Sequence, residues 1–477
     1  MTIYDFIKKF AKETPDKISL IGDREITYEE LYEKIVSFSN SIQNISNQSV
    51  ITLMFENSEE FVISYLGTIC SGKIAHLVSP NITKNNLETQ LKSANPKLII
   101  SSKQQIHKLR KFELTQFTIS EFENMFKTQK VNELRNPRNG DFSYLIYTSG
   151  TTSQPKGVAI THEQSMFTTN NIIKILKYNN SDVNLVPLPF VHSFGLGCLQ
   201  TSIMTGGSLL IEKNTIDIEN IFNLVKKYNV TTFAAVPATL TSIVKNHRKK
   251  AEMVFSELRL IMTNSTSVPI TTVRKFNEIL KCGNLATYYG LTEASRSSFM
   301  IFEKNLGKET SVGKPAPDVE IKIVNEDNNK NGNIWIKGKN VIKKYWENPE
   351  ADKKIVNEWL NTGDLGFFDS DGYLYLTGRI DDLINVAGQK VNPKEIEKIV
   401  KDIPEVEEVI AIGKENKIFG NTIKLFVQRH ENSNIKKTEI IAYCIKNLER
   451  YKVPTSIEFI DKFPRTDYGK IKRFMLE

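Results

Sequence analysis

A hydroxyl- and glycine-rich stretch at residues 147–157 has the residue types best suited to binding a ligand in this chain. It reads Tyr-Thr-Ser-Gly-Thr-Thr-Ser-Gln-Pro-Lys-Gly. It follows a β-prone run at 142–146 and precedes a helix start at Thr161, where Gln164 has capping-box spacing. A strand, loop and helix in this order direct backbone N–H groups, hydroxyls and the Lys156 ammonium at one point. This combination predicts a polyphosphate site.

The loop differs from a Walker A loop, because Lys156 is followed by Gly157 and no glycine directly precedes it. This difference suggests a nucleotide that is used for something other than γ-phosphate hydrolysis. A loop of this composition on its own would equally be a solvated turn. Four downstream motifs favour the phosphate interpretation: Tyr-Tyr-Gly-Leu-Thr-Glu at 288–293, Thr-Gly-Asp at 362–364, Gly-Arg-Ile-Asp-Asp at 378–382, and Pro-Arg-Thr-Asp-Tyr-Gly-Lys-Ile-Lys at 464–472.

In this order the five motifs resemble those of the adenylate-forming superfamily, which includes acyl- and aryl-CoA synthetases, adenylation domains of peptide synthetases and beetle luciferases. The resemblance spans about residues 15–472. It implies an ATP- and Mg²⁺-dependent ligase that converts a fatty or aryl-type carboxylic acid to acyl-AMP and then transfers the acyl group to CoA. A stand-alone enzyme that loads an acyl or peptidyl carrier protein, through its phosphopantetheine, is the alternative.

The resemblance also implies which residues bind the nucleotide. The loop would hold the β- and γ-phosphates, an aromatic ring would stack on adenine, and a carboxylate would accept the ribose hydroxyls. Ser153 stands where the family usually has glycine. Serine is less flexible than glycine, so this difference bears on the rate at which the loop moves and not on its identity. The implied ATP-binding residues are Thr148, Ser149, Gly150, Thr151, Thr152, Lys156, Tyr289, Gly290, Asp364 and Arg379.

In the implied reaction, a carboxylate attacks the α-phosphorus of ATP. Two anions must approach each other, so catalysis depends on charge neutralisation and positioning. Glu293 is the expected Mg²⁺ ligand, Thr292 the α-phosphate donor and Lys470 the catalytic ammonium. By resemblance, Asp381 is the hinge of a domain rotation and Gly388 lines the thiol tunnel.

The segment 187–195 bears on the acid substrate. Amino-acid-activating members have an aspartate here that pairs with the substrate ammonium, whereas this chain has His192 and Phe194. An uncompensated ammonium in an apolar pocket is costly, which disfavours an amino acid. Residues 263–267 are bulkier and more polar than the glycine- and alanine-rich run usual in the family. Further expected pocket walls are Ala235, Val236, Thr263 and Ser265.

The elements needed to position these residues indicate an α/β fold. Alternating short apolar runs and helical patterns before residue 319 predict helix-covered parallel sheets. From 320 to 377, short alternating runs separated by Gly, Asn and Asp predict antiparallel strands, as in a small barrel-like subdomain. After 384 the pattern predicts a small, mobile α+β domain. We therefore predict a large domain at 1–378, a small domain at 379–477 that carries the catalytic lysine, and a hinge at about 379–382.

Composition limits the alternatives. The chain has 477 residues, 40% hydrophobic content and a net charge of +8, with basic and acidic residues spread along its length. The scattered charge disfavours a nucleic-acid-binding module, and Lys470, Glu293 and Asp364 together argue against a silent AMP-binding protein. No feature supports a luciferase-like oxidation. Widely spaced cysteines, a start unlike a signal peptide and no apolar run of about 18 residues predict a cytoplasmic protein without a membrane span.

Overall fold

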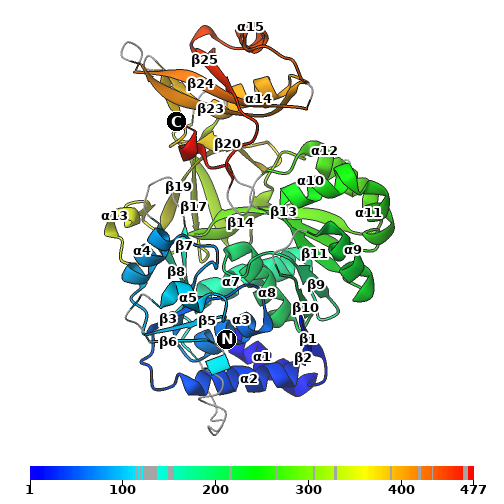
Figure 1. Cartoon of the computed structure of the whole chain (residues 1–477), viewed down its shortest axis with the longest axis vertical. Helices are drawn as coiled ribbons and strands as arrows, with labels where there is room; N and C mark the ends of the chain where they lie inside the picture. Colours follow the sequence, from blue (N-terminus) through cyan, green and yellow to red (C-terminus); the bar gives the residue numbers. More distant parts are fainter. Residues whose placement is uncertain are drawn as a thin grey trace. The chain divides into compact units, whose positions relative to one another are not determined.

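A computed structural model gives the fold of the chain (Figure 1). It describes residues 1–110, 112, 115–118, 120–121, 137–148, 155–213, 217–264, 267–304, 307–326, 330–386, 389–416, 420–431, 433–465 and 471–476. The chain divides into two compact units: unit 1 comprises Met1–Ile321 and Ile336–Leu360, and unit 2 comprises Lys322–Trp335 and Asn361–Glu477. No helix in the described ranges is long and apolar enough to cross a membrane.

The first sheet of unit 1 combines strands from the start and the middle of the chain. In spatial order they are β15 (Lys314–Pro315), β14 (Ala294–Ile301), β13 (Asn284–Leu291), β12 (Leu260–Thr263), β11 (Thr232–Ala235), β9 (Val183–Val186), β10 (Ser208–Ile211), β1 (Ile18–Ile21) and β2 (Glu25–Thr27). From β13 to β1 the neighbours pair in parallel, and the strands outside them pair antiparallel. The central strands are apolar and buried, as expected when helices cover both faces.

The second sheet of unit 1 ends in a hairpin. Its strands, in spatial order, are β6 (Gln116–Thr118), β5 (Leu98–Ser101), β3 (Val50–Met54), β4 (Ile74–Leu77), β7 (Phe142–Thr148) and β8 (Lys156–Thr161). The pairs are parallel except β7 with β8, which is antiparallel. These parallel sheets confirm the predicted architecture of the large domain.

Largely buried helices lie between the two sheets. Helix α7 (His162–Leu176) contacts β7, β8 and, on the other side, β14, while α8 (Ser193–Thr205) contacts α7, β9 and β10. Helix α3 (Glu59–Cys70) packs on β3 and β4 and is buried along its length, which is typical of an interior helix. The remaining helices of unit 1 are α1 (Ile3–Glu13), α2 (Tyr28–Ser41), α4 (Lys84–Ala94), α5 (Ile106–Leu109), α9 (Ile218–Lys227), α10 (Pro237–Asn246), α11 (Arg248–Val254), α12 (Ile270–Ile279) and α13 (Pro349–Asp352). Among them, α9 to α12 form one group, drawn in green in Figure 1.

Short strands follow in the chain, and the pairs among them whose register is described are antiparallel, as predicted. They are β16 (Val319–Val324), β17 (Gly332–Gly338), β18 (Ile355–Val356), β19 (Trp359–Phe368) and β20 (Leu374–Arg379). Within unit 2, β19 pairs antiparallel with β20, and Asp364 lies opposite Arg379. The Thr-Gly-Asp motif lies inside β19. Gly363 there has φ +73°, a left-handed conformation that glycine adopts without strain.

The rest of unit 2 is the predicted α+β domain. Its elements are β21 (Ile384–Val386), β22 (Gln389–Val391), α14 (Pro393–Lys401), β23 (Val406–Asn416), β24 (Gly420–Arg429), α15 (Lys437–Asn447), η1 (Arg450–Lys452), β25 (Ser456–Phe459) and η2 (Arg473–Met475). Helix α14 begins where the Asn392 side chain accepts the Lys394 N–H, and Ile396 and Val400 on its inner face join a buried cluster with Leu425. The domain limits at 378 and 379 and the hinge remain predictions.

Candidate active site

Strand pairing holds the two ends of the predicted phosphate loop together. Thr148 ends β7, Lys156 begins β8, and the two residues are direct antiparallel partners. The sequence-based prediction was wrong in continuing the loop to Gly157 and placing the helix directly after it, because the intervening residues form β8. The capping box that starts α7 is confirmed: the Thr161 hydroxyl accepts the Gln164 N–H, and the Gln164 side chain accepts the Thr161 N–H.

One short segment, residues 341–346, connects the base of this loop to the Tyr-Tyr-Gly-Leu-Thr-Glu motif. The Trp346 N–H donates to Gly157 O at 2.8 Å, and the Ile342 N–H donates to Glu293 O at 2.9 Å. The Gln164 amide donates to Val341 O at 2.7 Å, which ties the segment to the start of α7. The segment therefore holds Gly157, next to the base of the loop, and Glu293 in one framework within unit 1.

The side chain of Glu293 is also positioned by this segment. The Tyr345 hydroxyl donates to Glu293 Oε1 at 3.0 Å, and Tyr345 is buried. Burial, together with the Glu293 carboxylate, holds the pKa of the Tyr345 phenol well above its usual range. The phenol therefore stays protonated and keeps donating, which orients the carboxylate.

Glu293 can serve as a magnesium ligand in this arrangement. Among the described residues, no group of three or more His, Cys, Asp or Glu side chains is placed to hold a metal ion. Mg²⁺ is usually bound through one or two carboxylates, with substrate phosphates and water completing its shell. A single oriented carboxylate next to the phosphate-loop framework fits that pattern.

The end of β13 places the predicted adenine- and phosphate-binding residues. Tyr289 is buried, and Thr292 is half-buried just beyond the strand. A Cβ on Gly290 would lie 2.5 Å from Ala294 O and 2.6 Å from Arg296 N, so only glycine allows β14 to approach this closely. Gly290 thus has a packing role, besides any contact with ATP.

Unit 2 brings the predicted ribose-binding residues together. Arg379 Nη1 donates to Asp364 Oδ1 at 2.7 Å, and Nη2 donates to Thr362 O at 3.3 Å. Asp364 is buried, and Asp381 Oδ2 lies 3.8 Å from Arg379 Nη2. A buried carboxylate held by a guanidinium is pre-oriented to accept hydroxyl groups.

The predicted acid pocket collects at the carboxyl ends of parallel strands in unit 1. Ala235 ends β11 and Thr263 ends β12, and the two residues are direct partners. Val236 caps the start of α10 and is buried, as is Phe194 in α8. The Thr263 hydroxyl is buried and has no hydrogen-bond partner in the described part of the chain. Ligands of open α/β sheets bind at this edge, so these four residues are suitably placed to surround one.

His192 is the N-cap residue of α8, with its Nε2 enclosed by protein. Burial lowers the pKa of its imidazole to about 4. The ring is therefore neutral near pH 7, which suits its predicted place in the wall of the acid pocket.

Some predicted residues cannot be placed. The predicted site residues that lie outside the described part of the chain are Ser149, Gly150, Thr151, Thr152, Ser265, Gly388 and Lys470.

Two residues of this region were missed from the sequence. Tyr345 is one, because the hydrogen bond joins positions 52 residues apart. Arg296 is the other, and it contacts the first turn of α8 from β14. The only sequence signal for Arg296 is a lone charge in the small, hydroxyl-rich run Ala-Ser-Arg-Ser-Ser at 294–298.

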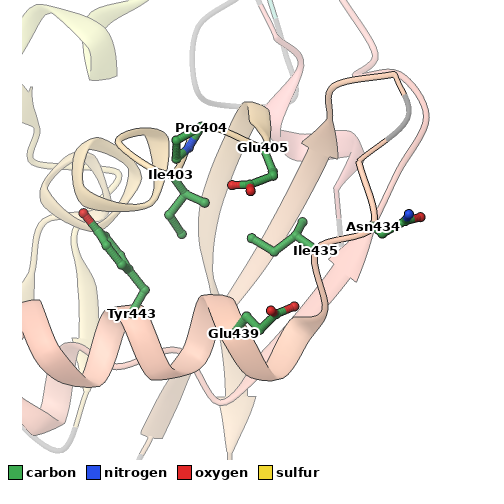
Figure 2. Close-up of a pocket in the computed structure, with 7 residues that line it drawn as sticks. All are labelled: Ile403, Pro404, Glu405, Asn434, Ile435, Glu439 and Tyr443. Atoms are coloured by element: carbon green, nitrogen blue, oxygen red, sulfur yellow. The ribbon is translucent and has the colours of Figure 1, made fainter.

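A separate hollow of about 500 Å³ lies in unit 2, where side chains from α15 face the residues that follow α14 (Figure 2). Carboxylates of Glu405 and Glu439 border it, together with Tyr443 and Ile435. It contains none of the predicted site residues, and two carboxylates disfavour an anionic ligand there.

Comparisons with known proteins indicate the same family as the order of the five motifs. The family model "AMP-binding enzyme" matches residues 7–346, and the model "AMP-binding enzyme C-terminal domain" matches residues 395–470. The chain is 31% identical to oxalate–CoA ligase of Arabidopsis thaliana, over 99% of this chain and 97% of the relative. It is 27% identical to a long-chain-fatty-acid–CoA ligase of Haemophilus influenzae, over 100% and 94% of the two chains.

A solved structure has the same fold. It is the o-succinylbenzoate CoA synthetase of Bacillus subtilis in complex with its acyl-adenylate intermediate, with a TM-score of 0.87, 24% identity, and coverage of 99% of this chain and 97% of that one. The likeness supports the predicted α/β architecture with a small C-terminal domain.

Proposed function

The chain belongs to the family of AMP-binding enzymes, and from this premise we propose that it is an ATP-dependent acid–thiol ligase. It would adenylate a carboxylic acid and then transfer the acyl group to CoA. The observation that carries the proposal is the 341–346 segment, which fixes Glu293 and the base of the phosphate loop in one framework. A ligase of this kind must hold a polyphosphate and a divalent cation side by side.

In the first step, a carboxylate oxygen of the acid attacks the α-phosphorus of ATP. The new bond is C(O)O–P, the α–β phosphoanhydride bond breaks, and pyrophosphate leaves with the electron pair. Thr292 would donate to the α-phosphate, and Lys470 would neutralise the two approaching anions. Mg²⁺, when bound, supplies positive charge to the phosphates, and Glu293, oriented by Tyr345, would hold it.

In the second step, a thiolate attacks the acyl carbon of the acyl-AMP. A thioester forms, the acyl–phosphate bond breaks and AMP leaves. Asp364 and Arg379 would hold the ribose through both steps, and their hydrogen bond keeps the carboxylate oriented when no ATP is bound. Rotation about Asp381 between the two steps, with Gly388 lining the thiol tunnel, remains part of the proposal.

CoA is the proposed acceptor, since the relatives described above are named as CoA ligases. Those names cover acids with one carboxyl group and acids with two, so they leave the acid open. We also propose a cytoplasmic location. All four cysteines are free, and three of them are buried, which suits a reducing compartment.

The test is acid-dependent ATP–pyrophosphate exchange without CoA, across short, long, aromatic, dicarboxylic and amino acids. Exchange with one class of carboxylic acid is the expected result, followed by saturable CoA consumption with the same acid. If ATP binds but no acid supports exchange, the ligase assignment is wrong. Exchange without CoA use would instead favour a carrier protein as acceptor.

A further inference from the structure

Arg296 is a buried cation that has no carboxylate partner among the described residues. It lies in β14, three residues after Glu293, and is 3% exposed. Within the described residues, no carboxylate lies at ion-pair distance from it, and its Nε has no hydrogen-bond partner. Arg259 provides a contrast in the same unit, because its guanidinium is paired with the buried Asp182.

The guanidinium of Arg296 occupies a space made by a missing side chain in α8. A Cβ on Gly197 would lie 1.8 Å from Arg296 Nη2, so any other residue would displace the cation. Nη2 donates to Ser193 O at 2.6 Å, and Nη1 donates to Ser295 Oγ. The cation also lies 5.0 Å from the centroid of the Tyr288 ring. These contacts fix its position but leave the Nε–H without an acceptor in the part of the chain that the structure describes.

The backbone of Arg296 is strained. Its φ is +59°, a left-handed conformation that a long side chain rarely adopts. Asn340 stabilises the residues on either side, since its Nδ2 donates to Ser295 O at 3.2 Å and to Ser297 Oγ at 2.9 Å. Strain of this kind, held by its surroundings, is concentrated at functional sites.

Arg296 contacts the wall of the proposed acid pocket. Its hydrogen-bond acceptor, Ser193, lies between the two pocket residues His192 and Phe194. The Phe194 ring meets Tyr288 edge-on at 5.7 Å between centroids, and Tyr288 is the residue that Arg296 stacks against. Helix α8 begins at Ser193 and runs for 13 residues, so its N-terminal partial charge adds to the positive field at this point.

An unpaired charge in the protein interior is strongly unfavourable unless a partner is supplied. We propose that Arg296 determines acid specificity by binding a second carboxylate of the substrate, so that the enzyme activates short dicarboxylic acids. This inference rests on the proposed function. A guanidinium suits the role because its planar N–H groups match a carboxylate, and the unsatisfied Nε–H is one of them.

Arg296 follows Glu293, the expected magnesium ligand, by three residues, and three residues of extended chain span at most about 11 Å between backbones. This proximity favours a short diacid, and the panel of acids below tests which chain length is best.

The test compares acids that differ only in the second charge. We would measure ATP–pyrophosphate exchange with malonate, succinate and glutarate, with their neutral monoamides, and with propionate, butyrate and valerate. For the best diacid, we expect kcat/KM at least tenfold above that of its monoamide and its monocarboxylate. Arg296→Met should lower kcat/KM for the diacid by about 100-fold or more. The ratio of kcat/KM for the monocarboxylate to that for the diacid should therefore rise.

The control is Arg274→Met, which removes an exposed arginine of α12 that pairs with Glu309. It should leave the preference unchanged. If Arg296→Met does not fold, Arg296→Lys serves instead, and we expect a smaller loss because the charge remains without the planar fork.

Three results would overturn the inference. The first is an equal kcat/KM for monocarboxylates and diacids in the wild type, and the second is an unchanged preference for diacids in the Arg296 variants. The third is an Arg296 variant whose only defect is weaker ATP binding, measured in the absence of acid. If no acid supports exchange, the ligase proposal fails separately. Calorimetric binding of the diacids then decides the role of Arg296: binding that is lost in Arg296→Met supports it, and absence of binding refutes it.

Discussion

The hydrogen bond from Tyr345 to Glu293 can be removed with little other change by Tyr345→Phe. The phenol is buried and donates to the carboxylate at 3.0 Å, whereas its ring and backbone contacts would remain. A hydrogen bond to a charged group contributes about 1.5–3 kcal/mol, and 1.4 kcal/mol corresponds to about tenfold in rate. Because Glu293 is half-buried, we expect the lower end: about a tenfold fall in the rate of acyl-AMP formation.

The assay is single-turnover formation of acyl-AMP at several Mg²⁺ concentrations. If Tyr345 orients the metal ligand, the variant should need more Mg²⁺ for half-maximal rate, with little change in the KM for the acid. Tyr443→Phe, at an exposed position of α15, is the matched control. An unchanged Mg²⁺ dependence in Tyr345→Phe would refute the assignment of Glu293 as the metal ligand held by Tyr345.

The other predictions use the same reactions and the stability of the fold. Lys470→Ala should abolish acyl-AMP formation yet retain most thioester formation from supplied acyl-AMP; equal loss of both steps would argue against a role confined to adenylation. Asp364→Ala should weaken ATP binding about tenfold by calorimetry, and unchanged affinity would remove it from the ribose site. Burial lowers the pKa of His76 to about 3 and of His162 to about 4. Both imidazoles are neutral in the folded protein, whereas in the unfolded chain they take up protons below about pH 6.5. The free energy of unfolding therefore falls as the pH drops below about 6.5, and at pH 5 each histidine has lowered it by about 2 kcal/mol. The melting temperature should therefore drop between pH 7.5 and 5, and less so in His76→Gln; a flat profile would contradict this.

Local signals in the sequence were sufficient for most of the framework. Thr161 and Gln164 marked the start of α7, and Thr27 with Glu30 forms the same capping box at α2. Such caps and apolar periodicities act over a few residues, so the chain displays them directly. Strand β8 was overlooked although Val158, within a short apolar run, signals it; the run is too short to separate strand from loop by periodicity.

The 341–346 segment could not be found in this way. Its backbone contacts with Glu293 and Gly157 join positions 49 and 189 residues apart in sequence, and its own residues match no motif. A single chain gives no direct evidence for such pairs, since neither partner has a local pattern that requires the other. Tertiary hydrogen bonds of this kind are therefore visible only in the folded structure.

The glycines of α8 show that the sequence can still indicate where distant parts of the chain approach a helix closely. Glycine in a helix interior costs about 1 kcal/mol relative to alanine, so two of them in one helix call for a packing reason. A Cβ on Gly195 would lie 2.4 Å from Pro189 O, and a Cβ on Gly197 would meet the Arg296 guanidinium. From the sequence alone, these glycines predict that other groups approach α8 closely. They cannot say that one of those groups is a buried cation, and that identity is what turns a packing requirement into a hypothesis about the substrate.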